Sequence, residues 1–393
     1  MFSRSRFCKT VTAYLPASVD KLLGIYLLDR ISLGLFAANQ AVNMILMILG
    51  SITILAAVMM ALIQHNMKRL LGYHAVSQVG YMVLGIGTGN PIGIAGGIFH
   101  MLNHAVYKSC LFFGAGNVEY RAKTTELNEL GGLARSMPFT YISFLVASLS
   151  ISGVPPFNGF VSKWMIYQGL VNRINDAGHI SRVVSILCFV AAMLGSGLTL
   201  ASFMKLLHAV FLGKGKNRQA REVPWLMLVP GALLALLCIV FGVFAFAVPL
   251  KYFVVPVVAS YRDLSGMAVP GAWSPKLATL IILLSLVFGL AVFYFSRLRT
   301  GLRQDEPFAG GQTSESIGEN TVTGADFYNT VRDISWIGGM YKKAENGLFD
   351  IYEQGKKVFS LSSALQYLHN GVLPTYMVWM LIGTMILFLM LLV

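Results

Sequence analysis

The chain contains a series of long apolar runs with few charged residues, most of them near the length of a membrane-spanning helix. A helix needs about 20 apolar residues to cross a hydrocarbon layer about 30 Å thick. Of the 393 residues, 56% are hydrophobic and only 12% are charged, which is more apolar surface than a water-soluble core can bury. The sequence therefore predicts an all-α, polytopic membrane protein with about nine transmembrane helices. The predicted spans are 12–37, 41–63, 69–88, 92–117, 138–171, 183–212, 225–250, 275–296 and 372–393.

The fifth predicted span, 138–171, is too long for one straight helix and contains helix-breaking residues near its middle. They are Gly153, Pro155, Pro156, Asn158 and Gly159. An interrupted helix is tolerated in a bilayer where protein or a water-filled cavity binds the freed backbone groups. We therefore expect one crossing made of two half-helices.

The distribution of basic residues predicts the orientation of the chain in the membrane. The formal net charge is +13, and most Lys and Arg residues fall on one side of the predicted spans. Because cytoplasmic segments are enriched in these residues, we expect a cytoplasmic N-terminus and an external C-terminus in a bacterial or archaeal cell membrane. The same pattern explains the positive charge without nucleic acid binding. The basic N-terminus leads into a stretch that contains Asp20 and Lys21 and has no small-residue cleavage site, which argues against a cleaved signal peptide.

A long polar segment precedes the last predicted span. Residues 297–325 are rich in Gly, Ser, Thr and acidic residues, which is typical of a linker. In residues 326–371, apolar side chains recur at approximately helical spacing among lysines. This pattern predicts an amphipathic lateral helix along the membrane surface or a neighbouring subunit, with a solvated basic linker as the alternative. The span 372–393 would then be a terminal transmembrane anchor.

His100, His104 and Lys108 are spaced four residues apart in an apolar run, so they share one face of a helix. A charge at that depth costs about 2.5 kcal/mol or more, so this face should meet a polar or hydrated interior. Imidazole titrates near neutrality, which favours proton transfer along the row. The alternative is that the histidines form hydrogen bonds across the bundle. A metal site is not expected, because no nearby carboxylate, cysteine pair or HExxH motif completes a ligand set.

Two further lysines lie within predicted spans. Lys163 follows the predicted break, where a cation would face the cavity opened by the interrupted helix and could load a proton. The alternative is a lysine whose amine extends to the membrane interface. Lys205 lies three residues before His208 near the cytoplasmic end of its span. An amine that extends to the interface is the favoured interpretation of Lys205, and proton uptake or release with His208 is the alternative.

Lys21 follows Asp20 near the start of the chain, and opposite charges at this spacing lower the cost of insertion. This pair is either a functional ion pair or a buried structural clamp. A preceding span adds polar groups that could order water or join helices by hydrogen bonds. These groups are Tyr73, His74, Ser77 and Gln78.

Motifs for cofactors are missing from the sequence. It has no Cys-x-x-Cys pair for an iron–sulfur cluster and no Walker-type nucleotide loop. Three of the four cysteines lie inside apolar runs, so no disulfide framework is indicated. We therefore expect neither a cofactor nor a metal, and the energy for transport would come from a partner or from an ion gradient.

Three motifs occur in the order KRLLGYHAVSQVGYMVLGIG, IFHMLNHAVYKSCLFFGAGNV and GVPPFNGFVSKWMI. In this order they resemble the antiporter-like membrane subunits of respiratory complex I, a family shared with multisubunit Na⁺/H⁺ antiporters and energy-converting hydrogenases. The polar tail and final span resemble the long-tailed, distal-subunit type. Members of the family have two inverted five-helix repeats, each with a broken helix. The resemblance implies that Lys108 is the central lysine of the second repeat and that Lys163 passes protons towards the external side.

The same resemblance divides the chain into a remnant of the first repeat at 1–40, the second repeat at 41–212 and two further helices at 213–296. Most of the first repeat has no counterpart, including its buried glutamate. A separate polypeptide supplies that half, or the sequence is a fragment, or the second repeat works alone.

We therefore expect a cofactor-free, proton-translocating subunit of a redox-driven pump, linked to NADH:quinone oxidoreductase-like or NiFe-hydrogenase partners. Its partners would be other membrane subunits and the lipid bilayer. The transported ion would be the proton, with Na⁺ as the alternative. A component of a gradient-driven Na⁺/H⁺ antiporter and a non-conducting structural or truncated subunit are the alternatives for the chain as a whole.

Overall fold

The chain folds into helices, as the apolar runs predict. The computed structural model describes residues 21–35, 39–176, 178–213, 220–260, 274–295, 328, 334–345, 371 and 373–391. Within these ranges the chain forms helices and no β-sheet, which confirms the all-α class. Two compact units are present, Met1–Tyr328 and Asn329–Val393.

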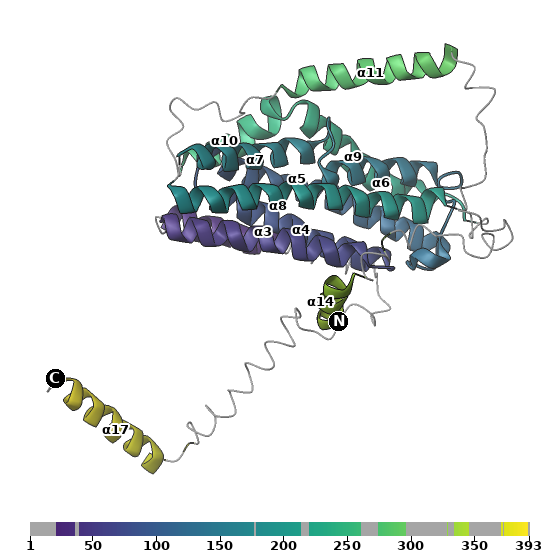
Figure 1. Cartoon of the computed structure of the whole chain (residues 1–393). Helices are drawn as coiled ribbons and strands as arrows, with labels where there is room; N and C mark the ends of the chain where they lie inside the picture. Colours follow the sequence, from purple (N-terminus) through teal and green to yellow (C-terminus); the bar gives the residue numbers. More distant parts are fainter. Residues whose placement is uncertain are drawn as a thin grey trace. The chain divides into compact units, whose positions relative to one another are not determined.

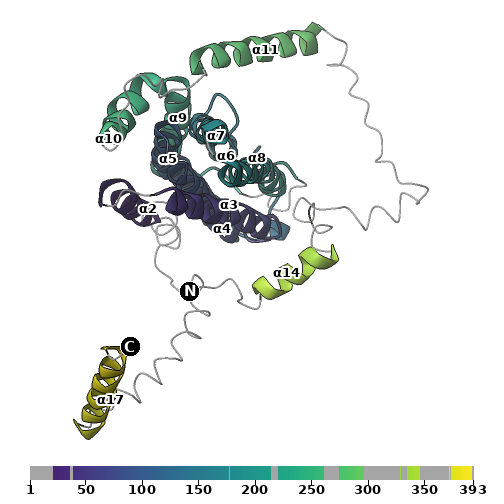
Figure 2. The ribbon, with the colours of Figure 1, turned by 60° about the vertical axis from the view of Figure 1, so that its left-hand side comes forward.

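The first unit is a bundle of long helices (Figures 1 and 2). In chain order its elements are α2 (Lys21–Asp29), the π-helix η2 (Arg30–Leu35), α3 (Gln40–Leu62), α4 (Met67–Gly87), α5 (Pro91–Ala122), the short 3₁₀ helix η3 (Leu127–Glu129), α6 (Pro138–Ser152), α7 (Asn158–Asp176), α8 (His179–Leu207), the π-helix η4 (His208–Leu212), α9 (Trp225–Val243), the π-helix η5 (Phe246–Val254), α10 (Val255–Ala259) and α11 (Pro275–Phe295). Helix α5 contacts α4, α6, α7 and α9, so it lies at the centre of the bundle. The second unit contains α14 (Ser335–Glu345) and α17 (Leu373–Leu391).

Four described helices are long and apolar enough to cross a membrane: Gln40–Leu62, His179–Leu212, Trp225–Val243 and Leu277–Phe295. The predicted number of about nine spans is therefore not confirmed. The predicted spans 69–88 and 92–117 are present as α4 and α5, but both helices contain buried polar and basic side chains. These side chains make α4 and α5 less apolar than α3, α8 and α9.

Several predicted boundaries change. The predicted span 225–250 is present as α9, but it is shorter than predicted, because α9 ends at Val243 and a π-helix that contains Pro249 follows. The apolar run continues through this change, so hydropathy does not mark it.

Of the first span, residues 12–20, 36 and 37 lie outside the described residues, as does the whole linker 297–325. The lateral helix 326–371 is described at Tyr328, residues 334–345 and Gly371 alone.

Asparagine side chains begin three of the bundle helices. Asn39, Asn66 and Asn90 accept hydrogen bonds from backbone N–H groups in the first turns of α3, α4 and α5. These N–H groups have no partner within their helix, and such a cap contributes about 1 kcal/mol. The chain thus fixes the starts of the two helices, α4 and α5, that carry most of the buried basic residues.

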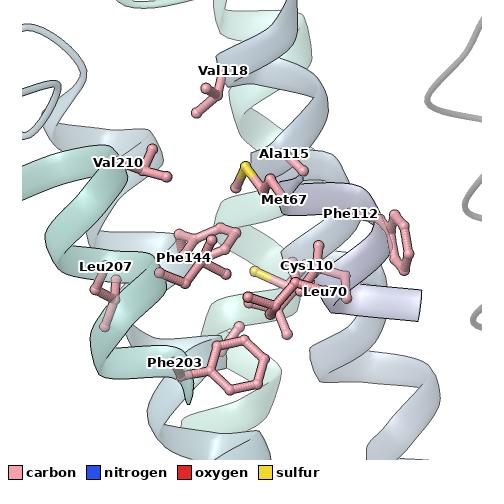
Figure 3. Packing of buried hydrophobic residues seen from close by; sticks show 14 of the residues in the cluster. Met67, Leu70, Cys110, Phe112, Ala115, Val118, Phe144, Phe203, Leu207 and Val210 are labelled. Carbon is pink, nitrogen blue, oxygen red and sulfur yellow. The ribbon is translucent and has the colours of Figure 1, made fainter. Parts of the chain in front are cut away.

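The bundle is apolar outside and partly polar inside. Large exposed apolar side chains include Leu49, Ile52, Leu187, Leu194, Leu233 and Leu236. One part of the interior is filled by a cluster in which α4, α5, α6 and α8 meet, shown in Figure 3. We name it the apolar cluster, and its labelled members are Met67, Leu70, Cys110, Phe112, Ala115, Val118, Phe144, Phe203, Leu207 and Val210. An apolar exterior around ionisable groups is the pattern of a protein whose solvent is lipid.

Candidate functional site

The predicted helix break is present between α6 and α7. Helix α6 ends at Ser152, and Gly153 caps it in the left-handed region at φ 80°, which glycine adopts without strain. The N–H group of Gly153 bonds back to the Ser150 carbonyl at 2.9 Å. The two helices lie one after the other along the bundle (Figure 1). The chain therefore has backbone carbonyls without helical partners in the interior of the bundle.

A pair of buried amides fixes the start of α7. The Asn103 amide on α5 donates to the Asn158 carbonyl at 2.9 Å, and the Asn158 amide donates to Asn103 Oδ1 at 3.0 Å. The Ser150 hydroxyl on α6 also donates to Asn158 Oδ1. The sequence analysis did not single out Asn103, although it lies in the same motif as the histidines. These contacts join both sides of the break to α5.

Lys163 is buried beside the break, with 2% of its surface exposed. Its Nζ donates to the Ile151 carbonyl in the last turn of α6 at 2.9 Å. This carbonyl belongs to the negative end of the helix dipole, which favours a cation. Nζ also lies 4.5 Å from the centroid of the Tyr81 ring. The interpretation of Lys163 as a residue that reaches the membrane interface is therefore wrong.

His100 is fully buried at the centre of a hydrogen-bond network. Its Nδ1 lies 2.9 Å from the Ser162 hydroxyl on α7, and its Nε2 lies 3.1 Å from Gln78 Oε1 on α4. The Tyr107 hydroxyl lies 3.2 Å from the same Nε2. The alternative of hydrogen bonds across the bundle is thus confirmed for His100, and every group in these bonds can donate or accept a hydrogen bond.

Lys108 and His104 are also fully buried. Among the residues that the structure describes, Lys108 Nζ has no hydrogen-bond partner, and it lies 5.9 Å from the centroid of the Phe112 ring. The His104 ring packs edge-on against Tyr107, with 5.7 Å between centroids. A buried ammonium without acceptors is costly, so Lys108 requires either water or the neutral state.

His74 connects the lysines electrostatically. It is fully buried on α4, its Nε2 lies 2.8 Å from the Ser202 hydroxyl on α8, and the charges of Lys108 and Lys163 both act on it. Lys163 also acts on His100, and Lys21 acts on Lys108. We name these five residues the basic row: Lys21, Lys108, His74, Lys163 and His100.

Lys205 does not extend to a surface. It is 1% exposed, and its Nζ donates to the Leu62 and Gln64 carbonyls at 2.7 and 3.1 Å, where α3 ends. The favoured interpretation of Lys205 as a surface-seeking amine is therefore wrong. His208 begins η4, its side chain is half-buried, and its carbonyl accepts from the Gly213 N–H at 2.7 Å.

Lys21 is half-buried at the start of α2. Its predicted partner Asp20 lies outside the described residues. Two turns on, Asp29 is 6% exposed, and its Oδ1 has no hydrogen-bond partner within the described part of the chain. In that part no three His, Cys, Asp or Glu side chains gather in a way that could hold a metal ion.

Residues 8–189 match the family model described as "NADH:quinone oxidoreductase/Mrp antiporter, TM". The chain is 33% identical to formate hydrogenlyase subunit 3 of Escherichia coli over 57% of this chain and 40% of the relative. It is 34% identical to Na(+)/H(+) antiporter subunit A1 of Staphylococcus saprophyticus over 60% of this chain and 31% of that protein. The chain thus spans less than half the length of these curated relatives.

A solved structure has the same fold over most of the chain. It is the membrane-bound sulfane sulfur reductase, described as an archaeal respiratory membrane complex, with a TM-score of 0.72 at 22% identity. The match covers 98% of this chain and 64% of the matched chain. At this identity the likeness establishes the fold.

Proposed function

We propose that this chain, whose residues 8–189 match the NADH:quinone oxidoreductase/Mrp antiporter transmembrane family model, is a proton-translocating subunit of a redox-driven membrane complex. One observation carries the proposal: Lys108 is a fully buried amine without a hydrogen-bond partner among the described residues, next to an electrostatic row of other basic groups. A structural lysine would have fixed acceptors. An amine without them can alternate between two protonation states as water and charge around it change.

The proton would pass between groups that are already near one another. Lys108 and Lys163 both act on His74, and Lys163 acts on His100, which is hydrogen-bonded to three polar side chains. Water between these groups would complete the transfers, because no hydrogen bond among the described residues joins one of these groups to the next. Lys21 would deliver charge to Lys108 from the side of α2.

The proposed setting is a multisubunit complex in a bacterial or archaeal cell membrane. The family name and the names of the relatives support partners of the NADH:quinone oxidoreductase or hydrogenase class. Those partners would perform the electron transfer, and this chain would move protons in response. We propose a cytoplasmic N-terminus and an external C-terminus on the basis of the charge distribution.

Replacing Lys108 with alanine tests the proposal. In proteoliposomes that hold the complete complex, we expect Lys108→Ala to abolish proton translocation and to leave electron transfer measurable. Proton uptake is followed with a pH-sensitive dye while the electron donor is consumed. Lys251→Ala is the matched control, because Lys251 is an exposed lysine of η5. Proton translocation at the native rate in Lys108→Ala would remove the proposal.

A second candidate function is a component of a gradient-driven Na⁺/H⁺ antiporter. It is supported by the relative named as Na(+)/H(+) antiporter subunit A1. This function predicts sodium-dependent proton exchange in vesicles without any electron donor. Exchange under those conditions would favour it over the redox-driven pump, and its absence together with donor-dependent pumping would favour the pump.

A further inference from the structure

The Tyr81 ring and the Lys163 amine form a buried pair that connects α4, α7 and α8. Lys163 Nζ lies 4.5 Å from the centroid of the ring, and both side chains are almost completely buried. The Tyr81 hydroxyl donates to the Ala192 carbonyl on α8 at 2.7 Å and lies 2.9 Å from the Ser196 hydroxyl. The Tyr167 hydroxyl lies 2.6 Å from that same serine.

We propose that Tyr81 is a positioning residue that holds the protonated form of Lys163 against its ring face, and that its anchor on α8 fixes the ring for this purpose. The inference rests on the proposed role of Lys163 in proton transfer. It identifies the Tyr81 ring as a group that raises the proton affinity of the Lys163 amine. A cation over the face of an aromatic ring is attracted by the electron density of that face, and the attraction is strongest where water is excluded.

The anchor leaves the ring little freedom. A Cβ atom at Gly195 would lie 3.0 Å from the Tyr81 hydroxyl and 2.2 Å from Ile54 Cγ2, so α8 passes directly over the end of the side chain. A buried tyrosine hydroxyl needs a hydrogen-bond partner, and the positions of its partners fix the direction of the ring. Here the hydroxyl has two partners on α8 while the ring faces the amine on α7.

Two neutral groups stabilise the protonated amine of Lys163: the Tyr81 ring and one backbone carbonyl. From α4 it faces the Tyr81 ring, and its charge acts on His74 of α4 and on His100 of α5. From α6 it meets the Ile151 carbonyl. Within the described part of the chain, no carboxylate forms an ion pair with Lys163. Removing the ring therefore leaves the buried ammonium with less to offset the cost of its removal from water.

Loss of the Tyr81 ring would destabilise the protonated form of Lys163, so Lys163 would release its proton at a lower pH. Where transport needs protonated Lys163, the alkaline limb of the rate-versus-pH profile would move to lower pH by about one unit. A purely structural role of Tyr81 would lower the amount of folded protein and leave the position of this limb unchanged.

The test compares variants at position 81 in the complete complex in proteoliposomes. We expect Tyr81→Leu to shift the alkaline limb by about one unit and Tyr81→Phe, which keeps the ring, to stay close to the native profile. Tyr141→Leu on α6 is the control, because Tyr141 packs against Phe211 and lies in no contact with Lys163. An unshifted limb in Tyr81→Leu, or equal shifts in Tyr81→Leu and Tyr81→Phe, would overturn the proposal.

Fluorinated phenylalanines at position 81 keep the size of the ring while they weaken its negative face, so they address the case in which Tyr81→Leu does not fold. A shift that grows with each added fluorine is expected, and a constant profile across the series would contradict the pairing. The titration of Lys163 itself separates this inference from the proposed function. The ¹³Cε signal of labelled lysine, assigned by its loss in Lys163→Met, would shift with the ring in nanodiscs whether or not protons are transported.

Discussion

The amines of Lys108, Lys163 and Lys205 are all buried, but their surroundings differ. Lys205 donates to two carbonyls, Lys163 to one carbonyl beside a ring, and Lys108 to no described residue. Fixed acceptors hold an ammonium in place, and their absence leaves the proton state open to water and to nearby charges. We therefore propose a structural role for Lys205, beside the proposed transfer role of the other two.

The structural role of Lys205 predicts a loss of stability without a loss of function. Lys205→Met keeps the length of the side chain and leaves the Leu62 and Gln64 carbonyls without their donor. We expect the free energy of unfolding to fall by about 1–3 kcal/mol. Thermal unfolding in detergent measures this change, and transport per folded molecule should stay near native. A large loss of transport at unchanged stability would instead support proton uptake or release through Lys205.

At the residue scale, the sequence predicts which side chains of one helix share a face, but not what they meet. The spacing of His100, His104 and Lys108 correctly places all three in the interior. Tyr81 and Ser162 could not be assigned, because their role depends on contacts between helices that are far apart in the sequence. The favoured interpretation of Lys205 failed for the same reason, since its acceptors lie 141 and 143 residues away.

At the element scale, α9 packs directly against the break between α6 and α7. A Cβ atom added at Gly242 would lie 2.0 Å from the Pro156 carbonyl oxygen and 2.7 Å from the Asn158 nitrogen. Both neighbours are backbone atoms, which cannot rotate away as the end of a side chain can. The geometry of the break therefore depends on a glycine in another helix.

This contact predicts that Gly242→Ala lowers the free energy of unfolding by about 1–3 kcal/mol through overpacking. Gly231→Ala in the same helix is the control, because a Cβ atom there meets nothing within 4 Å. Replacing that helical glycine with alanine should leave stability unchanged or raise it by up to about 1 kcal/mol. Melting curves of both variants in detergent compare the two sites, and equal stability would contradict the close packing of α9.

Helix-breaking residues predicted the end of a helix correctly, whereas hydropathy missed one. Gly153 and the residues after it marked a break that the structure contains. The end of α9 at Val243 went unnoticed, because the residues beyond it remain apolar. Apolar runs show that a segment prefers lipid or a core, and they say little about where one helix stops and another begins.

At the scale of the whole molecule, the division into two units predicts what a shortened chain would do. The basic row and every described buried apolar residue except Tyr341 lie within Met1–Tyr328. We expect a chain of residues 1–328 to fold with near-native thermal stability and to lose association with its partner subunits. Size-exclusion chromatography after heating tests folding, and co-purification tests association. Full association of the shortened chain would show that Asn329–Val393 is dispensable for assembly.

All five members of the basic row carry positive charge when protonated, and no carboxylate neutralises them within the described bundle. In a medium of low dielectric constant, such charges repel one another over several ångströms, so the sites cannot all fill together. Proton occupancy of the row is then anticooperative. Protonation of one residue of the row would favour deprotonation of the next, so each proton that enters the row would move the others on by one site.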